Sequence, residues 1–323
     1  MSAQSGIFTI SLDFELHWGI FDNVPIAGKE AYFDNTIKLI PDLLERFSSH
    51  GIQATWATVG LLFNKNFDQL KRNYPEQLPS YINSKFSAYN FIETELDKNN
   101  EKYYLAADLI SQIQNTPGQE IATHTYAHYY TLEKGQTIDE FEEDIKKAVT
   151  LAQASGIALK SIVFPRNQIN YEYTDVCKRH GIYIFRENPN KWAWNPKVKP
   201  VILRKIMRTA DCYFPLFNTQ VSISALKSAI NGEIYLPSSR LLRPISGIRI
   251  LDQMRLRRIK KEMTKAAKDG TYYHLWWHPH NFGSSPQEAM NELDIILTHY
   301  KKLNNDYNMI SLNMNNTYKM LNN

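Results

Sequence analysis

The chain has few cysteines and no long apolar run, and these absences exclude several classes of protein. Only Cys177 and Cys212 occur among 323 residues, which excludes a disulfide-stapled scaffold and a multi-cysteine metal set. No apolar stretch approaches the roughly 20 residues that span a bilayer. A charged leader followed by an apolar core is also missing, so we expect no signal peptide and a cytoplasmic location. The net charge of +4 is too small to indicate a nucleic-acid partner.

Repeats and low-complexity linkers are absent too, and 43% hydrophobic with 22% charged residues is ordinary globular composition. A strand pattern at 7–15, an amphipathic helix at 34–50 and a strand at 52–63 open the chain, and this β-α-β order predicts a parallel sheet. Further strands are expected at 119–123, 161–165, 183–185 and 270–278, and further helices at 137–155, 171–180, 249–268 and 286–302. We therefore predict a single α/β barrel domain over 1–323, with insertions at about 64–108 and 190–268.

Two histidines four residues apart, His124 and His128, follow the short strand pattern at 119–123. On a helix, residues at this spacing share one face and could bind one divalent ion. Alone the pair is a weak signal, but Asp13 and Glu15 follow an earlier strand pattern and offer a carboxylate. A catalytic zinc site typically combines three protein ligands with an open position for water.

Active sites of parallel β/α barrels lie at the carboxyl ends of the strands. Reactive side chains stand at four predicted strand ends: Asp13 with Glu15, His124 with His128, Arg166, and His278. The sequence therefore predicts that these residues meet at one edge of the sheet.

The order of these segments resembles the polysaccharide deacetylase family, which is carbohydrate esterase family four with the fold of the nodulation-factor chitooligosaccharide deacetylase. The resemblance covers about 7–185 and 270–285, and its most specific segment is the His-Thr-x-x-His of 124–128. The matching segments read Ser11-Leu12-Asp13-Phe14-Glu15, Ala54-Thr55-Trp56-Ala57-Thr58-Val59-Gly60, Gly118-Gln119-Glu120-Ile121-Ala122-Thr123-His124-Thr125-Tyr126-Ala127-His128, Phe164-Pro165-Arg166-Asn167 and Leu275-Trp276-Trp277-His278. Two departures are that Pro165 precedes Arg166 and that the family's fourth motif, Asp-x-x-Asp-Trp, is not evident.

The resemblance implies a distorted (β/α)7 barrel and metal-dependent hydrolysis of an N-acetyl group on a sugar, with a divalent metal, zinc first among them. It assigns His124, His128 and Glu15 as metal ligands and Asp13 as general base, with the two acids' roles exchanged as the alternative. His278 would protonate the departing amine, a role that His274 or His280 could also fill. Arg166 would orient Asp13, and a backbone N–H near Asn167 would stabilise the oxyanion.

Substrate contacts are expected at Trp18, Asn167, Trp276 and Trp277, with core packing as the alternative reading of the tryptophans. Basic residues crowd the range 240–268, which indicates either a solvated helix face or a peripheral contact with phosphates or a membrane surface. With a cytoplasmic location, we expect the carbohydrate substrate to be a nucleotide- or lipid-linked intermediate of surface polysaccharide biosynthesis.

Three other functions remain open from the sequence. A glycosidase on the same barrel would use the two carboxylates without a metal. A hydrolase of another non-peptide amide, such as a ureide, would keep the metal. A catalytically silent glycan-binding protein would keep only the aromatic residues.

Overall fold

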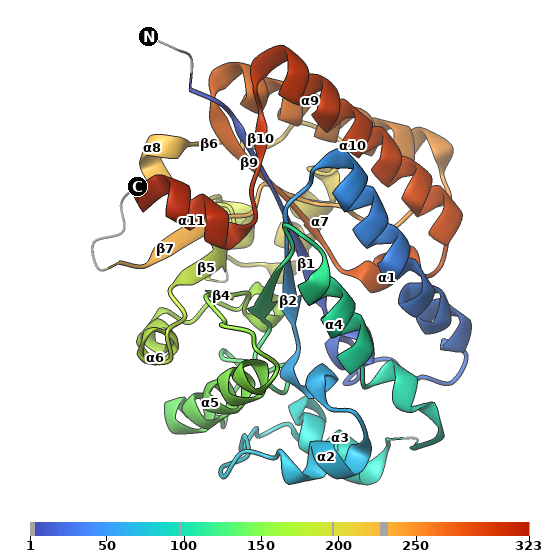
Figure 1. Ribbon diagram of the computed structural model, residues 1–323, viewed down its shortest axis with the longest axis vertical. Coiled ribbons are helices and arrows are strands. Elements are labelled where there is room, and N and C mark those ends of the chain that lie inside the picture. Colours follow the sequence, from blue (N-terminus) through green and yellow to red (C-terminus); the bar gives the residue numbers. More distant parts are fainter. Residues whose placement is uncertain (1–3, 97, 196, 227–231, 323) are drawn as a thin grey trace.

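A mainly parallel sheet that nearly closes into a barrel forms the centre of the molecule (Figure 1). The computed structural model describes residues 4–96, 98–195, 197–226 and 232–322. Neighbouring strands follow the order β9-β1-β2-β3-β4-β5-β7, and every pairing along this path is parallel. Their bounds are β1 Ile7–Phe14, β2 Ala54–Thr58, β3 Glu120–Thr123, β4 Ser161–Ile162, β5 Ile184–Glu187, β7 Ile234–Pro237 and β9 Thr271–Trp277.

The two ends of the sheet are joined by the segment 234–241, whose first half pairs with β5 and whose second half pairs with β9. β7 pairs with β5, and after Ser238 and Ser239 the chain continues as β8 (Arg240–Leu241), which pairs with β9. The N–H of Ser238 donates to the Glu187 carbonyl on one side, and the N–H of Ser239 donates to the His274 carbonyl on the other. This closure confirms the expected distorted barrel. The short strands β6 (Val221–Ser222) and β10 (Ile310–Ser311) add to β9 and β1.

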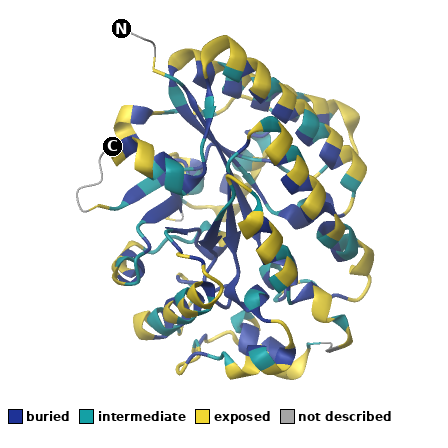
Figure 2. Cartoon of the chain, in the orientation of Figure 1, coloured by how far each residue is buried: buried dark blue, intermediate teal, exposed yellow. Residues whose placement is uncertain are grey.

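Amphipathic helices cover the barrel, with their buried faces toward the sheet and their exposed faces toward solvent (Figure 2). Helix α5 shows how the sequence sets its start: Thr137 Oγ1 accepts from the Glu140 N–H, and the Glu140 carboxylate accepts from the Thr137 N–H, which is a capping box. The helices are α1 Glu30–His50, α2 Phe67–Arg72, α3 Ala88–Thr94, α4 Ala107–Asn115, α5 Ile138–Ala154, α6 Thr174–Arg179, α7 Val201–Ala210, α8 Ile223–Leu226, α9 Arg249–Asp269, α10 Pro286–Tyr307 and α11 Met314–Asn322.

The two expected insertions differ in kind. The range 64–108 adds the short helices α2 and α3 ahead of α4, between β2 and β3. The range 190–268 also contains β7, β8 and α9, which belong to the sheet and its cover. The pattern of apolar residues did not predict β7 and β8, because both strands are short and prolines are scattered through this range. Within the described residues, no helix combines the length and the apolar character needed to cross a membrane.

Glu120, at the amino end of β3, joins three parts of the barrel, and we expect its loss to destabilise the fold. Its carboxylate accepts from Thr55 Oγ1 at 2.7 Å, from Ser161 Oγ at 2.5 Å and from the N–H of Asn315 at 3.0 Å. Glu120→Ala leaves these donors without an acceptor and should lower the free energy of unfolding by about 1–3 kcal/mol in urea denaturation.

The exposed Glu45→Ala on α1 is the matched control and should change stability little. Equal effects of the two substitutions would contradict the role given to Glu120.

Candidate active site

The predicted reactive residues meet at the carboxyl edge of the barrel. Asp13 lies near the end of β1 and Glu15 follows it, while His124 and His128 follow β3. His278 follows β9, and all of these side chains except His278 are nearly inaccessible to solvent. Because the strands are parallel, their carboxyl ends share one edge, and residues more than 100 positions apart become neighbours.

Glu15, His124 and His128 form a cluster with the chemistry of a metal site. Glu15 Oε2 lies 3.2 Å from His124 Nε2 and 3.2 Å from His128 Nε2. The outer nitrogens of the rings are occupied, since His124 Nδ1 lies 2.8 Å from the Val163 carbonyl and His128 Nδ1 lies 3.1 Å from the Tyr130 hydroxyl. Such partners fix each ring with Nε2 toward the shared carboxylate, as in protein metal sites. Two imidazoles and one carboxylate therefore fit a divalent ion.

A loop, not a helix, brings the two histidines together. Residues 124–128 contain no helical turn, and Thr125 and His128 have φ of 64° and 54°. The hydroxyl of Thr125 accepts from the N–H of Tyr129, and Asp144 on α5 accepts from the N–H groups of Tyr126 and Ala127. These side-chain acceptors replace helical hydrogen bonds, so the helical geometry considered for this segment is wrong although the convergence is correct.

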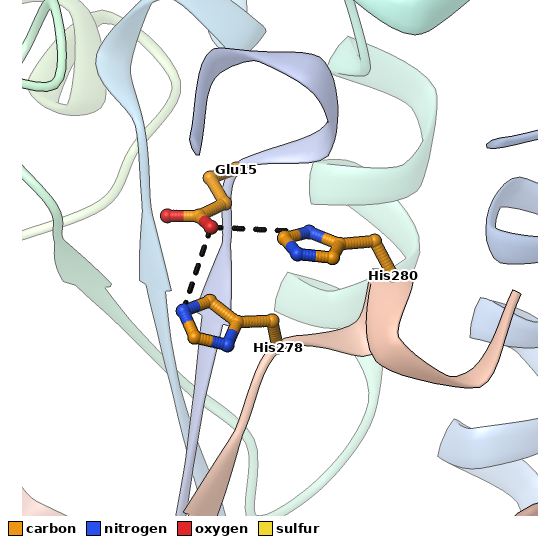
Figure 3. Close-up of side chains that lie close together, drawn as sticks. All are labelled: Glu15, His278 and His280. Carbon is orange, nitrogen blue, oxygen red and sulfur yellow. Dashed lines mark ion pairs between the residues drawn. The ribbon is translucent and has the colours of Figure 1, made fainter. Parts of the chain in front are cut away.

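Glu15 also faces a second pair of histidines (Figure 3). Its Oε1 lies 3.5 Å from His278 Nε2 and 3.8 Å from His280 Nδ1, and His280 is in the 3-10 turn η8 (Pro279–Phe282). These distances are longer than those to His124 and His128, and His280 Nδ1 has no hydrogen-bond partner among the described residues. Burial raises the pKa of Glu15, but the surrounding histidines outweigh it and hold that pKa well below its usual range.

Asp13 is bound by an arginine that the sequence analysis did not single out. Arg186 on β5 donates from Nη1 to Asp13 Oδ1 at 2.5 Å and from Nη2 to Oδ2 at 2.8 Å, and both side chains are buried. Burial raises the pKa of Asp13, but the Arg186 guanidinium more than offsets it and leaves that pKa below its usual value. The sequence did contain a signal for this role, since Arg186 is a charged residue directly after the apolar run 182–185.

Arg166, expected to orient Asp13, lies elsewhere. Its guanidinium pairs with Asp22 and stacks 4.2 Å from the centre of the Tyr130 ring. The expectation rested on Arg166 standing where the family's Arg/Pro motif belongs. In the structure the guanidinium that binds Asp13 comes instead from Arg186 on the next strand, β5.

Asn167 supports the site through its side chain. Its Oδ1 accepts from Arg186 Nη2 at 2.8 Å. Its backbone N–H donates to the Phe164 carbonyl, so this N–H is engaged and is not the free oxyanion donor that we expected nearby.

The tryptophans divide between the site and the core. Trp276 is partly exposed, and its ring lies 4.4 Å from the Arg186 guanidinium. Trp18 is fully buried and donates to the Tyr104 carbonyl, and Trp277 is fully buried and stacks on Phe282. The expected substrate contacts at Trp18 and Trp277 are therefore wrong: both are core residues.

Much of the basic range 240–268 is engaged in internal ion pairs. Arg240 and Arg258 both bind Asp211 and Glu262, and Arg255 binds Glu292. All three arginines are buried, so they stabilise the packing of α9 and are not a free surface for phosphates.

A cleft of about 1120 Å³ opens beside the site. Asn167 and Trp276, which contact Arg186, line one part of it, and residues of α7 line another part. The cleft is therefore linked to Asp13 through Arg186, which holds that carboxylate.

The architecture and the site define a barrel hydrolase, and comparisons with known proteins identify its family. The polysaccharide deacetylase family model matches residues 21–185, just over half of the chain. The chain belongs to this family, whose members are carbohydrate esterases acting on N-acetyl groups of sugars. The match includes His124 and His128, whereas Asp13, Glu15 and His278 lie outside it and depend on the geometry above. No curated protein sequence matches the chain significantly.

Solved structures share the fold at low sequence identity. A protein described as a polysaccharide deacetylase from Mycobacterium smegmatis aligns with a TM-score of 0.56 and 11% identity, over 99% of this chain and 91% of that one. A similarly described protein from Pseudomonas aeruginosa PAO1 gives 0.57 and 10%, over 98% and 90%. PuuE allantoinase gives 0.56 and 9%, over 98% and 90%.

We expect His124→Ala to abolish stoichiometric binding of a divalent ion, because it removes one of the three candidate ligands. The measurement is metal content of purified protein by elemental analysis after loading with zinc. His50→Ala, on the outer part of α1, is the control and should retain wild-type metal content. Undiminished metal in His124→Ala would place the ion elsewhere, with His278 and His280 as the next candidates.

Proposed function

We propose that this protein is a metal-dependent sugar N-deacetylase. One observation carries the proposal: Glu15 lies between His124 and His128 at 3.2 Å from each Nε2, on the same barrel edge as Asp13 and His278. This arrangement combines a ligand set, a base and an acid in one site.

Glu15, His124 and His128 would hold the ion, and two nitrogens with one oxygen suit zinc. A divalent ion there would supply Lewis acidity toward the amide carbonyl and lower the pKa of water. Glu15 is the better candidate ligand because its carboxylate faces both histidines. Both oxygens of Asp13 are bound by Arg186, so we assign Asp13 as the base.

Asp13 would accept the proton of the attacking water. The paired Arg186 keeps its carboxylate ionised at neutral pH, which a base requires. The fork of two hydrogen bonds also fixes the orientation of the carboxylate.

His278 would give the proton to the departing amine. Its Nε2 lies 3.6 Å from Asp13 Oδ2 and 3.5 Å from Glu15 Oε1, and it is more exposed than the other site residues, so it can reach substrate. His280 is stacked behind it, and burial with the neighbouring His278 lowers the pKa of His280 to about 3, so a neutral His280 is a poor proton donor.

For the substrate, we propose a nucleotide- or lipid-linked glycan intermediate of surface polysaccharide biosynthesis, handled in the cytoplasm. Trp276, beside the cleft, offers an aromatic surface for a sugar ring. A contact with phosphate or a membrane surface through 240–268 would involve Arg243, which lines the cleft, and the exposed Arg257.

The three alternative functions are a glycosidase, a ureide hydrolase and a silent glycan-binding protein. A glycosidase of this type needs one carboxylic acid with a raised pKa, whereas surrounding cations hold the pKa of both Asp13 and Glu15 below the usual range. The likeness to PuuE allantoinase concerns the fold. Acetate release separates N-deacetylation from ureide hydrolysis and from silent glycan binding.

We expect Asp13→Asn to lower kcat about 10²–10⁴-fold, because the variant cannot accept the proton. The assay is acetate release from an N-acetylated chitooligosaccharide. EDTA should abolish the wild-type activity, and zinc or cobalt should restore it. Asp108→Asn, exposed on α4, is the control and should be fully active. Activity that persists without metal would refute the proposal.

We expect Arg186→Lys to move the acidic limb of the kcat/KM–pH profile to higher pH. Arg186 lowers the pKa of Asp13, and lysine loses the two-pronged contact, so that pKa rises toward its ordinary value and a higher pH is needed to ionise the base. Arg166→Lys, which alters the pair with Asp22, should leave this limb in place. A shift in Arg166→Lys but not in Arg186→Lys would reverse the assignment of the two arginines.

A further inference from the structure

Three arginines in the cleft lack a carboxylate partner. Arg204 and Arg208 lie one turn apart on α7, and Arg243 follows β8. Among the residues that the structure describes, no acidic group lies within ion-pair distance of any of the three. By contrast, the buried arginines Arg240, Arg255 and Arg258 are all paired with acids.

The cluster is partly removed from water. Arg204 is only 9% exposed, and the Nε atoms of Arg204 and Arg243 are buried with no hydrogen-bond partner in the part of the chain that the structure describes. Burial together with the charges of Arg204 and Arg243 lowers the pKa of Arg208, so Arg208 experiences the positive charge of both. Buried donors and uncompensated positive charge are costly unless an anion occupies the space between them.

We propose that Arg204, Arg208 and Arg243 bind a phosphoryl group of the substrate. The cleft that they line also contains Asn167 and Trp276, which contact the Arg186 that holds Asp13. A sugar bound against Trp276 and a phosphate bound at the three arginines would thus lie in the same cleft. Guanidinium groups suit this task because they donate paired hydrogen bonds to phosphate oxygens. The inference deepens the proposed deacetylase function and rests on it.

Two sources could supply the phosphoryl group: a nucleotide sugar or a lipid phosphate sugar. Helix α7 bears on this choice because its apolar face is turned to solvent, with Ile202 62%, Ile206 55% and Leu203 43% exposed. An apolar surface on the helix that carries two of the arginines is the arrangement that a lipid-linked substrate at a membrane surface would need.

The test compares substrates with and without phosphate. Acetate release is measured with N,N'-diacetylchitobiose, with UDP-N-acetylglucosamine and with a polyprenyl diphosphate N-acetylglucosamine in detergent micelles. We expect kcat/KM to be higher for a phosphorylated substrate than for the neutral sugar. In Arg204→Gln and Arg208→Gln this advantage should fall about 10–100-fold, mainly through KM, because charge-assisted hydrogen bonds are lost. Activity on the neutral sugar should stay within about twofold of wild type.

Arg72→Gln on α2, which removes an exposed arginine that does not line the cleft, is the matched control and should behave as wild type with every substrate. Preference between the nucleotide and the polyprenyl substrate identifies the source of the phosphate. An equal loss on neutral and phosphorylated substrates, or no preference for phosphate in the wild type, would overturn the inference.

Thermal unfolding gives a readout that does not depend on turnover. Inorganic pyrophosphate should raise the Tm of the wild type, and this rise should be absent in Arg208→Gln. Without ligand, Arg208→Gln should melt at or above the wild-type Tm, because the substitution relieves repulsion among like charges. A purely structural arginine would instead lower the Tm when replaced. If pyrophosphate stabilises the wild type while no substrate releases acetate, the phosphate subsite stands and the deacetylase function fails.

Discussion

The buried ion pair between Asp13 and Arg186 is the constraint on which the rest of the site depends. Placing two charges in the barrel interior costs several kcal/mol each, and that cost is offset only when both ions are fully bonded. Here the guanidinium donates to both carboxylate oxygens, to Ser11 Oγ and to Asn167 Oδ1, and it lies against Trp276. These contacts join β1, β5, the turn after β4 and β9, so the pair fixes the relative positions of the strand ends.

Glu15 depends on this arrangement because it extends from the same strand as Asp13. One of its oxygens faces His124 and His128, and the other faces His278 and His280. The outer nitrogens of His124 and His128 are held by the Val163 carbonyl and the Tyr130 hydroxyl. The site is thus organised before any substrate arrives, which is the condition for efficient positioning of reacting groups.

Charge balance distinguishes the parts of the molecule that serve the fold from those available to a ligand. Arg240, Arg255 and Arg258 have acidic partners and hold α9 against the barrel. Arg204, Arg208 and Arg243 have no such partner among the described residues, and they line the cleft. Likewise, Trp18 and Trp277 complete the core, whereas Trp276 reaches the cleft. The same residue types therefore serve structure or function according to what surrounds them.

The sequence by itself determined the parallel barrel and most of its candidate site. Strand and helix periodicity is local, and residues at the carboxyl ends of parallel strands share an edge, so Asp13, Glu15, His124, His128 and His278 could be grouped in advance. Only the tertiary structure decided that Arg186 rather than Arg166 binds Asp13, that a loop joins the two histidines, and that Trp18 and Trp277 are buried. Partner choice depends on distances between segments far apart in the chain, and burial depends on which face of an element meets its neighbour. The spacing of apolar residues along the chain does not encode distances between remote segments or the face that an element turns to its neighbour.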